Sequence, residues 1–323
     1  MTYKSQPSPR PAGKCASGKH VAILMSTFNG ESYLQEQLDS LYQQTHSDWS
    51  IYSSDDGSSD RTLEILRQNQ LSLGSERLSI RNGPARGFSS NFLSLLRAGD
   101  IDAQYFAFCD QDDLWNPDKL ENALNWLSSV PQNVPALFCS RTRLINESGY
   151  PMGFSPLFRR PPSFSNALVQ SIAGGNTMVM NVAARNLMAR TPQDMSVASH
   201  DWWAYLLVTG CGGAVFYEST PQVDYRQHGQ NLMGSNTRLR DRIARLIKMF
   251  DGTFRDWNSA NITALESFEQ ELTALNRTSL DVFRHARGGS LGCRLAGLRR
   301  AGIHRQSMVE NLGLTAAILI NRV

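Results

Sequence analysis

The sequence lacks the residue patterns that would hold a small secreted or zinc-bound fold together. It contains only five cysteines among 323 residues, an odd number and widely spaced. No zinc-ligand spacing or disulfide framework is present, and most of these cysteines lie within apolar runs, which is typical of reduced thiols. We therefore expect a cytoplasmic protein that is stabilised by its own core. Its length suffices for one large α/β domain with an extension, or for two domains.

Long apolar runs are also missing. A helix needs roughly 20 apolar residues to cross a bilayer, and the longest candidate, 312–320, is too short. Residues 1–19 are rich in Pro, Ser and Lys and lack the apolar stretch of a signal peptide, which favours a disordered tail. We expect the protein to be free in the cytoplasm or peripheral at the inner face of the membrane.

Neither sign of charge is in large excess, since 32 Lys and Arg oppose 29 Asp and Glu and give +3. Residues 238–323 carry 14 Arg and Lys against 8 Asp and Glu, or +6, which leaves −3 for residues 1–237. We expect 238–323 to form a basic helical extension. Its segment 282–309 suits an anionic membrane surface, a solvated helix face or a contact in a homo-oligomer. It lacks the interleaved aromatic residues of single-strand binders, so no nucleic-acid partner is expected.

Strand and helix patterns alternate from residue 20 onward. Val21–Met25 is a continuous apolar run typical of a buried parallel strand, and leucines at helical spacing follow it. Further strands are predicted at 49–53, 78–81, 105–109, 136–140 and 171–181, and a loop is predicted at 151–162. The alternation predicts a doubly wound sheet over residues 20–237, with its ligand at the carboxyl ends of the strands.

Three polar loops follow the predicted strands and should meet at that edge. They are Ser26–Gly30, Asp55–Ser58 and Asp110–Asp113. The last holds three carboxylates, whose repulsion and desolvation are costly unless a cation or hydrogen-bond donors offset them. Carboxylate oxygens favour Mg²⁺ or Mn²⁺ over zinc. The alternative is an acidic loop that only caps the next helix.

With the segment His200–Trp203, these loops occur in the order seen in family 2 glycosyltransferases, which the chain resembles over about residues 20 to 235. The resemblance implies the GT-A fold, a Rossmann-like mixed sheet flanked by helices, and an inverting sugar transfer. The segment 225–231 resembles that of rhamnosyltransferases that build O-antigen, capsule or similar cell-surface polysaccharide. It implies transfer of L-rhamnose from dTDP-rhamnose to a saccharide or lipid-linked acceptor.

The resemblance also assigns nucleotide-binding residues. Thr27, Phe28 and Asn29 would surround the nucleotide, mainly through backbone contacts. Asp55 would accept a hydrogen bond from the N3–H of uracil or thymine, which suits an acceptor-only side chain. Asp56 is placed in the same site, with turn geometry as its main role.

The expected metal ligands are Asp110 and Asp112, the Asp-X-Asp motif of the resemblance, together with His228. Asp112 would bind the cation directly, and Asp110 would lie near the ribose or a metal-bound water. His228 would complete the coordination or contact the diphosphate; a structural histidine is the alternative. The cation, Mg²⁺ or Mn²⁺, would stabilise the departing diphosphate.

Asp201 is the expected catalytic base, which takes a proton from the acceptor hydroxyl. The residue before it is His200, where the family usually has a glutamate.

The donor sugar or acceptor is expected to contact Asp113, Asn176, Trp202 and Trp203. The two tryptophans offer aromatic faces on which sugars stack, although one of them is expected in the core, as is Trp115.

Three other readings of the sequence stay open. They are a glycosyltransferase that uses a UDP-hexose, a sugar-phosphate nucleotidyltransferase, and a nucleotide-sugar-binding protein without turnover. A nucleotidyltransferase normally has a glycine-rich loop with a basic residue after the first strand, and Ser26–Gly30 lacks it. The sequence does not specify the acceptor, the linkage or the oligomeric state.

Overall fold

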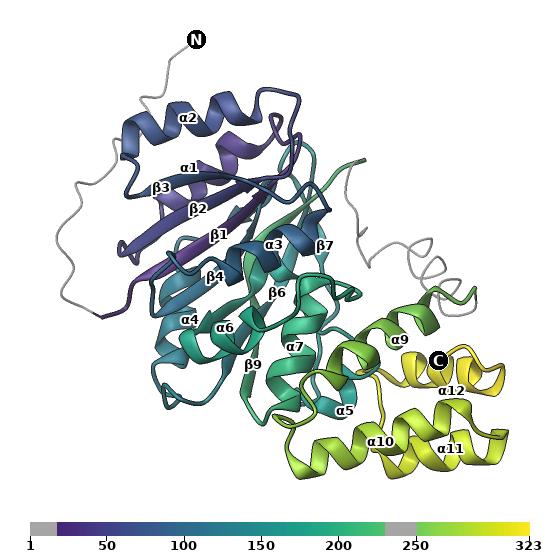
Figure 1. Cartoon of the computed structure of the whole chain (residues 1–323). Helices are drawn as coiled ribbons and strands as arrows, with labels where there is room; N and C mark the ends of the chain where they lie inside the picture. Colours follow the sequence, from purple (N-terminus) through teal and green to yellow (C-terminus); the bar gives the residue numbers. More distant parts are fainter. Residues whose placement is uncertain (1–17, 230–250) are drawn as a thin grey trace.

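The computed structural model describes residues 18–229 and 251–323, which form a nine-stranded mixed sheet with helices on both faces (Figure 1). The strand order is β3-β2-β1-β4-β8-β6-β9-β5, and β7 pairs with β6. This confirms the predicted α/β architecture. Almost all of the predicted tail 1–19, and the predicted boundary at 237, lie outside the described residues.

One half of the sheet is parallel. Its strands are β3 (Leu78–Asn82), β2 (Trp49–Asp55), β1 (Val21–Thr27) and β4 (Tyr105–Asp110), connected by α1 (Leu34–Tyr42), α2 (Thr62–Leu73) and α3 (Phe88–Arg97). Side chains of β1 alternate between two cores: Ile23 joins the cluster under α1 and α4 (Lys119–Leu127), and Leu24 joins the cluster under α3. Burial on both faces explains why the first strand is a continuous apolar run.

The other half mixes strand directions. It contains β5 (Leu114–Trp115), β6 (Ala136–Asn146), β7 (Pro151–Phe154), β8 (Val179–Asn181) and β9 (Ala214–Gln227), with α5 (Phe164–Ala167), α6 (Val182–Ala189) and α7 (His200–Gly210). Two expectations need correction here. The strand predicted at 171–181 is only β8, because Gly175–Thr177 form a 3-10 helix, η1, and the loop predicted at 151–162 contains β7.

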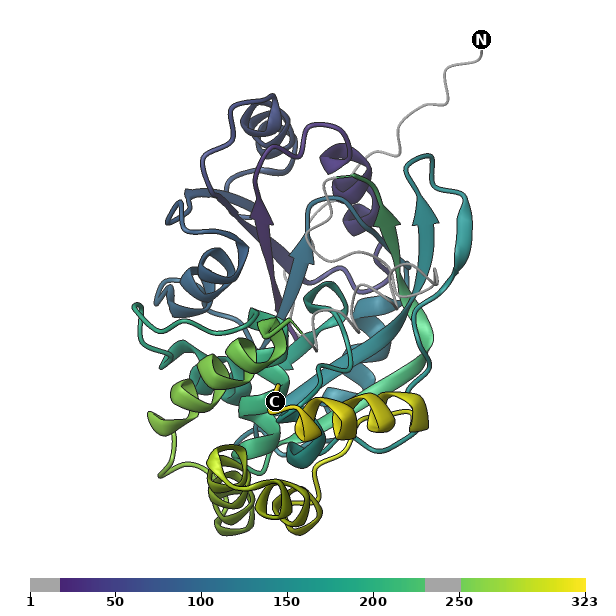
Figure 2. The same cartoon turned by 90° about the vertical axis from the view of Figure 1, so that its right-hand side faces the viewer.

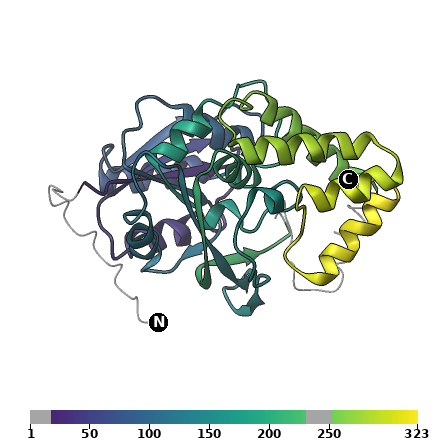
Figure 3. The ribbon, with the colours of Figure 1, turned by 90° about the horizontal axis from the view of Figure 1, so that it is seen from below.

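The described part of the C-terminal segment is helical, as expected. It consists of α9 (Thr253–Glu266), α10 (Ala274–Gly288), α11 (Leu291–Arg300) and α12 (Met308–Leu319). These helices gather at the end of the molecule away from the N-terminal strands (Figure 3). They share a hydrophobic core with α3, α5, α6 and α7. No helix in residues 18–229 or 251–323 is long and apolar enough to cross a membrane.

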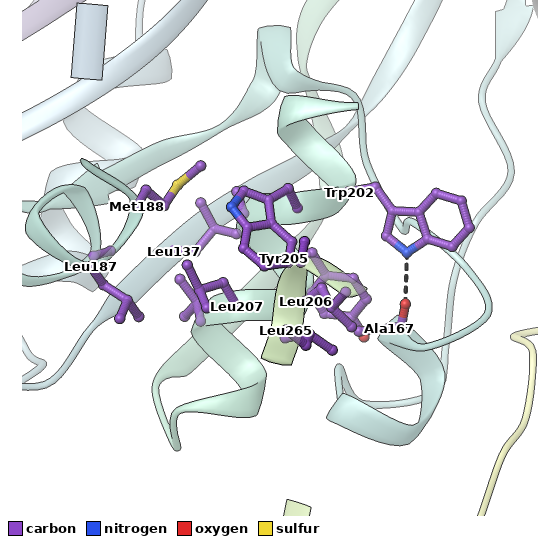
Figure 4. Packing of buried hydrophobic residues seen from close by; sticks show 14 of the residues in the cluster. Leu137, Ala167, Leu187, Met188, Trp202, Tyr205, Leu206, Leu207 and Leu265 are labelled. Atoms are coloured by element: carbon purple, nitrogen blue, oxygen red, sulfur yellow. Dashed lines mark hydrogen bonds between the residues drawn. The ribbon is translucent and has the colours of Figure 1, made fainter. Parts of the chain in front are cut away.

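The centre of that core is α7, whose side chains are almost all buried (Figure 4). The Trp202 indole N–H donates to the Ala167 carbonyl at 2.6 Å, and that of Trp203 donates to the Thr191 hydroxyl at 2.9 Å. Trp202 is 6% exposed and Trp203 is fully buried. The core position expected for one of the two therefore holds for both, and the predicted sugar stacking is contradicted because neither ring offers a free face.

Candidate active site

The carboxyl ends of β1, β2 and β4 meet at one edge of the sheet, and the view from that side shows the arrowheads of β1 and β4 together (Figure 2). Strand register pairs Thr27 with Asp55 and Ser26 with Asp110. The three polar loops predicted to share an edge therefore do so.

Asp55 is buried at this edge, and its carboxylate is held by four hydrogen bonds. One oxygen accepts from the hydroxyls of Thr27 and Ser58, and the other accepts from the backbone N–H groups of Gly57 and Ser58. These bonds are the geometry of a strand-to-helix turn. The turn role predicted mainly for Asp56 thus belongs to Asp55.

Asp56 instead fastens the neighbouring loop between β3 and α3. Its two carboxylate oxygens accept from the backbone N–H groups of Ala85 at 2.7 Å and Gly87 at 2.8 Å. Gly83 packs so close that a Cβ there would lie 2.6 Å from an Asp56 oxygen. Only glycine fits this contact, so the loop over the predicted nucleotide site is fixed by backbone bonds.

The loop after β1 is fixed in the same way. Asn29 has a positive φ of 47°, donates its N–H to Ser58 and accepts from the Ser59 N–H. The Gln111 side chain bonds both the N–H and the carbonyl of Phe28, at 2.8 and 2.9 Å. The Phe28 ring is 56% exposed and free to meet a ligand. Gln111, inside the acidic tetrapeptide, thus couples the nucleotide loop to the carboxylates, a role that the sequence analysis missed.

Asp113 and Asn176 contact each other below the surface of the site. Asp113 is fully buried and accepts from the Asn176 amide and from the Arg226 backbone N–H. Burial, followed by the charges of Asp112 and Asp110, holds the pKa of Asp113 well above its usual range. The pair joins η1, β9 and the acidic loop, so both residues support the site from below.

Asp112 is paired with His228 at the end of β9. The His228 Nε2 atom lies 2.7 Å from an Asp112 oxygen, and both side chains are largely buried. Arg226, two residues earlier, donates to the backbone carbonyls of Asp112 and Glu147 and to the carboxylate of Glu36. Segments 116 residues apart are thereby brought together, as the predicted ligand set requires.

Asp110 differs from these carboxylates, because its side chain makes no hydrogen bond within the described residues. Burial, then the negative charges of Asp112 and Asp201, raises its pKa to about 8. The charge that opposes this shift is that of Lys119, whose Nζ lies 3.1 Å from the centre of the Trp115 ring and has no hydrogen-bond partner among the described residues. Burial lowers the pKa of Lys119 to about 7. Trp115 is 3% exposed, which confirms its core role.

Asp201 lies in the first turn of α7, where the positive end of the helix dipole favours a carboxylate. Its Oδ1 atom accepts from the Ser199 hydroxyl and from the Trp202 N–H, which leaves Oδ2 free of these bonds. The charge of Asp201 raises the pKa of Asp110, so the two carboxylates lie within electrostatic reach of each other.

His200 is enclosed by aromatic rings from α3 and β4. Its ring stacks on Phe92 at 4.1 Å and meets Phe88 and Phe108 edge-on. A Cβ at Gly175 would lie 2.3 Å from its Nε2, and neither ring nitrogen has a hydrogen-bond partner. Burial lowers the pKa of His200 to about 4, so the imidazole is neutral at physiological pH.

Asp110 and Asp112, with His228 beside them, have the chemistry of a site for a hard divalent cation, since carboxylate oxygens are preferred ligands of Mg²⁺ and Mn²⁺. In residues 18–229 and 251–323 no three Asp, Glu, His or Cys side chains are grouped closely enough to bind one metal ion. Two observations favour a cation: Asp112 and His228 are in contact, and the carboxylate of Asp110 has neighbours of its own charge without a compensating donor.

A mixed sheet with carboxylates along the ends of its parallel strands is the arrangement of nucleotide-sugar glycosyltransferases with the GT-A fold. Residues 22–179 match Glycosyl transferase family 2. These residues therefore form a domain of glycosyltransferase family 2.

Two relatives are informative. The chain is 29% identical to the dTDP-rhamnosyl transferase RfbG of Shigella flexneri over 69% of this chain and 78% of that protein. It is 27% identical to the putative teichuronic acid biosynthesis glycosyltransferase TuaG of Bacillus subtilis, over 59% and 73%.

Solved structures agree on the fold. S. aureus TarS in complex with UDP has a TM-score of 0.52 at 14% identity, covering 87% of this chain and 90% of that one. The mannosyltransferase PcManGT of Pyrobaculum calidifontis, in complex with GDP-Man and Mn²⁺, has a TM-score of 0.50 at 17% identity, covering 95% and 86%. At these identities the likeness concerns the fold alone.

Proposed function

We propose that this chain is an inverting, metal-dependent glycosyltransferase that moves L-rhamnose from dTDP-rhamnose to a saccharide or lipid-linked acceptor in cell-surface polysaccharide synthesis. The observation that carries the proposal is the pair of carboxylates, Asp110 and Asp201, that keep free oxygens and interact through their charges. The other acidic side chains of the edge are bound within the protein.

The donor nucleotide would lie on the loops after β1 and β2. Asp55 and Asp56 keep these loops in one conformation, and the exposed Phe28 ring offers a face for the base. Since the Asp55 carboxylate already accepts four hydrogen bonds, its oxygens have room for few further donors. The base would therefore be recognised by loop backbone as well as by this carboxylate.

Asp110, Asp112 and His228 would hold Mg²⁺ or Mn²⁺, which supplies positive charge for the diphosphate as the glycosidic bond breaks. Asp112 is oriented for this by His228, and its backbone carbonyl is fixed by Arg226. A metal would also offset the charge of Asp110 that is costly in the protein alone.

Asp201 would act as the base. In an inverting displacement the base removes the acceptor proton on the side opposite the leaving diphosphate. The Ser199 hydroxyl and the Trp202 N–H bind Oδ1 of Asp201 and orient the carboxylate, so Oδ2 remains to accept the proton. The neutral His200 ring behind it adds no charge that would weaken this basicity.

Rhamnose as the donor sugar is supported by the dTDP-rhamnosyl transferase of Shigella flexneri at 29% identity, and a role in surface polysaccharide by that relative and TuaG. A donor panel tests the proposal: purified protein is heated with dTDP-rhamnose, UDP-glucose, UDP-galactose or UDP-GlcNAc, with and without Mn²⁺. A bound ligand raises the melting temperature, so the largest shift is expected for dTDP-rhamnose with Mn²⁺.

Slow release of dTDP from the same donor, measured without acceptor, separates an enzyme from a binding protein. A larger shift with a UDP-hexose would show that the donor is that sugar nucleotide and not dTDP-rhamnose. The protein would still be a glycosyltransferase. Equal shifts in melting temperature with and without Mn²⁺ would show that the cation has no role in donor binding.

A further inference from the structure

Helix α12 is apolar on two faces, although only one of them is buried. The buried face consists of Leu314, Ala317 and Ile318, and the exposed face of Met308, Val309, Leu312, Leu319 and Ile320. Met308 is 81% exposed, Leu312 70% and Leu319 48%, and their spacing of four and seven residues aligns them on one stripe. A helix that is apolar all round is normally covered on every side, so this stripe calls for an occupant.

Exposed arginines precede and follow α12 in the sequence. Arg299 and Arg300 at the end of α11, and Arg322 after α12, are exposed and outside every ion pair between described residues. The only acid after Asp281 is Glu310, and it is occupied by the capping box with Ser307 and by the Gln170 amide. Arginines thus flank α12 along the chain, and the helix itself has no free carboxylate.

We propose that α12 docks this protein onto an anionic lipid surface. The stripe would enter the boundary between headgroups and acyl chains, and the arginines would contact lipid phosphates. The charge pattern favours lipid over a second copy of the chain, because α12 has no free carboxylate of its own to pair with the arginines of a symmetric copy.

The placement of α12 agrees with this use. Figure 2 shows α12 on the side of the molecule from which the arrowheads of β1 and β4 are also visible. A lipid surface along α12 would therefore adjoin the side that carries the active-site edge. The inference stands without the proposed function, and its test does not use activity.

The test is flotation of the full chain with vesicles of phosphatidylglycerol and phosphatidylcholine, compared with phosphatidylcholine alone, at physiological salt. We expect binding to the anionic vesicles and little to the neutral ones. The double variant Met308→Gln, Leu312→Gln should lose about tenfold or more in vesicle partitioning. Arg299→Glu with Arg300→Glu should lose at least roughly tenfold, and the loss should shrink as salt rises.

The matched control is Leu71→Gln, since Leu71 is 87% exposed on α2, far from α12 (Figure 1). It should bind vesicles like the wild type, and circular dichroism should show that all variants fold. Absence of binding to anionic vesicles, or equal loss in the Leu71 variant, overturns the proposal. It is also overturned by a concentration-dependent dimer in light scattering that the α12 variant dissociates, with no vesicle binding, because the stripe is then an interface between copies.

Discussion

The carboxylates at the sheet edge divide into two groups that the sequence does not distinguish. On the side where we propose that the nucleotide binds, the nucleotide side, Asp55 accepts four hydrogen bonds and Asp56 two. On the reaction side, Asp110 has no such bond in the described structure, and Asp201 has one oxygen in use. Hydrogen-bonded carboxylates fix loops, whereas the unbonded ones keep oxygens for a cation or a proton.

The free energy needed to keep a buried carboxylate ionised differs between the two groups. Backbone N–H groups stabilise a buried carboxylate without a second charged residue. Asp110 instead has a raised pKa because burial and like charges oppose its ionisation. Ionisation of Asp110 is therefore unfavourable in the protein alone, and we expect a bound metal to favour it.

The largest expected effect comes from the reaction side. Asp201→Asn keeps the shape of the side chain but removes its basicity, so we expect transfer to fall by roughly 10²- to 10⁴-fold. Binding of the nucleotide sugar with Mn²⁺ should change little, because Asp201 is not among the proposed donor ligands. Single-turnover transfer and donor titration measure the two quantities separately.

One outcome for Asp201→Asn would contradict this prediction. If the Asn variant transfers sugar at the wild-type rate, Asp201 is not the base and the division between the two groups fails. Asp112→Asn is the companion variant. In this variant transfer should fall, and donor binding should no longer depend on Mn²⁺.

The next effect concerns the nucleotide side and is a loss of stability. Asp55→Ala leaves the N–H groups of Gly57 and Ser58 and the Thr27 hydroxyl without their acceptor, which should cost on the order of 3 kcal/mol of unfolding free energy. Urea denaturation measures this change. Asp55→Asn retains one acceptor oxygen and should lose less, and equal stability of wild type and Asp55→Ala would contradict the structural role.

A third prediction uses the aromatic enclosure of His200. Its pKa is lowered to about 4 by burial, whereas the ordinary value is 6.5, so the unfolded chain binds a proton that the folded chain does not as pH falls below 6.5. Stability should therefore be full above pH 6.5 and decrease toward pH 4, by on the order of 2 kcal/mol. His200→Phe should remove this part of the pH dependence.

Chemical denaturation of both proteins between pH 7 and pH 4.5 tests the point. The difference between them isolates His200 from the carboxylates, which titrate in both. Parallel curves would show that the imidazole is charged or solvated in the folded state.

Much of the fold was predictable because it depends on local patterns. The runs at β1 and β4 are apolar on both faces and are followed by leucines at helical spacing, so the parallel half of the sheet was found. β9 was missed because its polar middle, Glu218 to Gln222, lacks a period of two. The expected strand at 171–181 shrank to three residues because η1 turns the chain at Gly175.

The site was harder, because partners come from distant segments. The order of motifs identified the acidic residues, but it did not reveal which ones accept backbone bonds. Gln111 and Arg226 hold the site through bonds to Phe28 and to the Asp112 carbonyl, and no local pattern indicates such contacts. The two tryptophans were misplaced for the same reason: a Trp pair beside a catalytic residue suits a sugar surface and a helix core equally well.

The smallest effect tests that correction. Trp202→Phe removes the N–H that bonds the Ala167 carbonyl and leaves that buried acceptor unpaired, at a cost of about 1 to 2 kcal/mol in stability. If the ring belongs to the core, as its stacked contact with Phe254 and its edge-on contact with Trp257 indicate, the KM values for donor and acceptor stay unchanged while the melting temperature falls. Asp201, one residue away, then serves as the internal reference, since its Asn variant should lower turnover and leave the melting temperature nearly constant. A Trp202→Phe protein with wild-type stability and a raised acceptor KM would contradict the core assignment and would show that the ring contacts the acceptor.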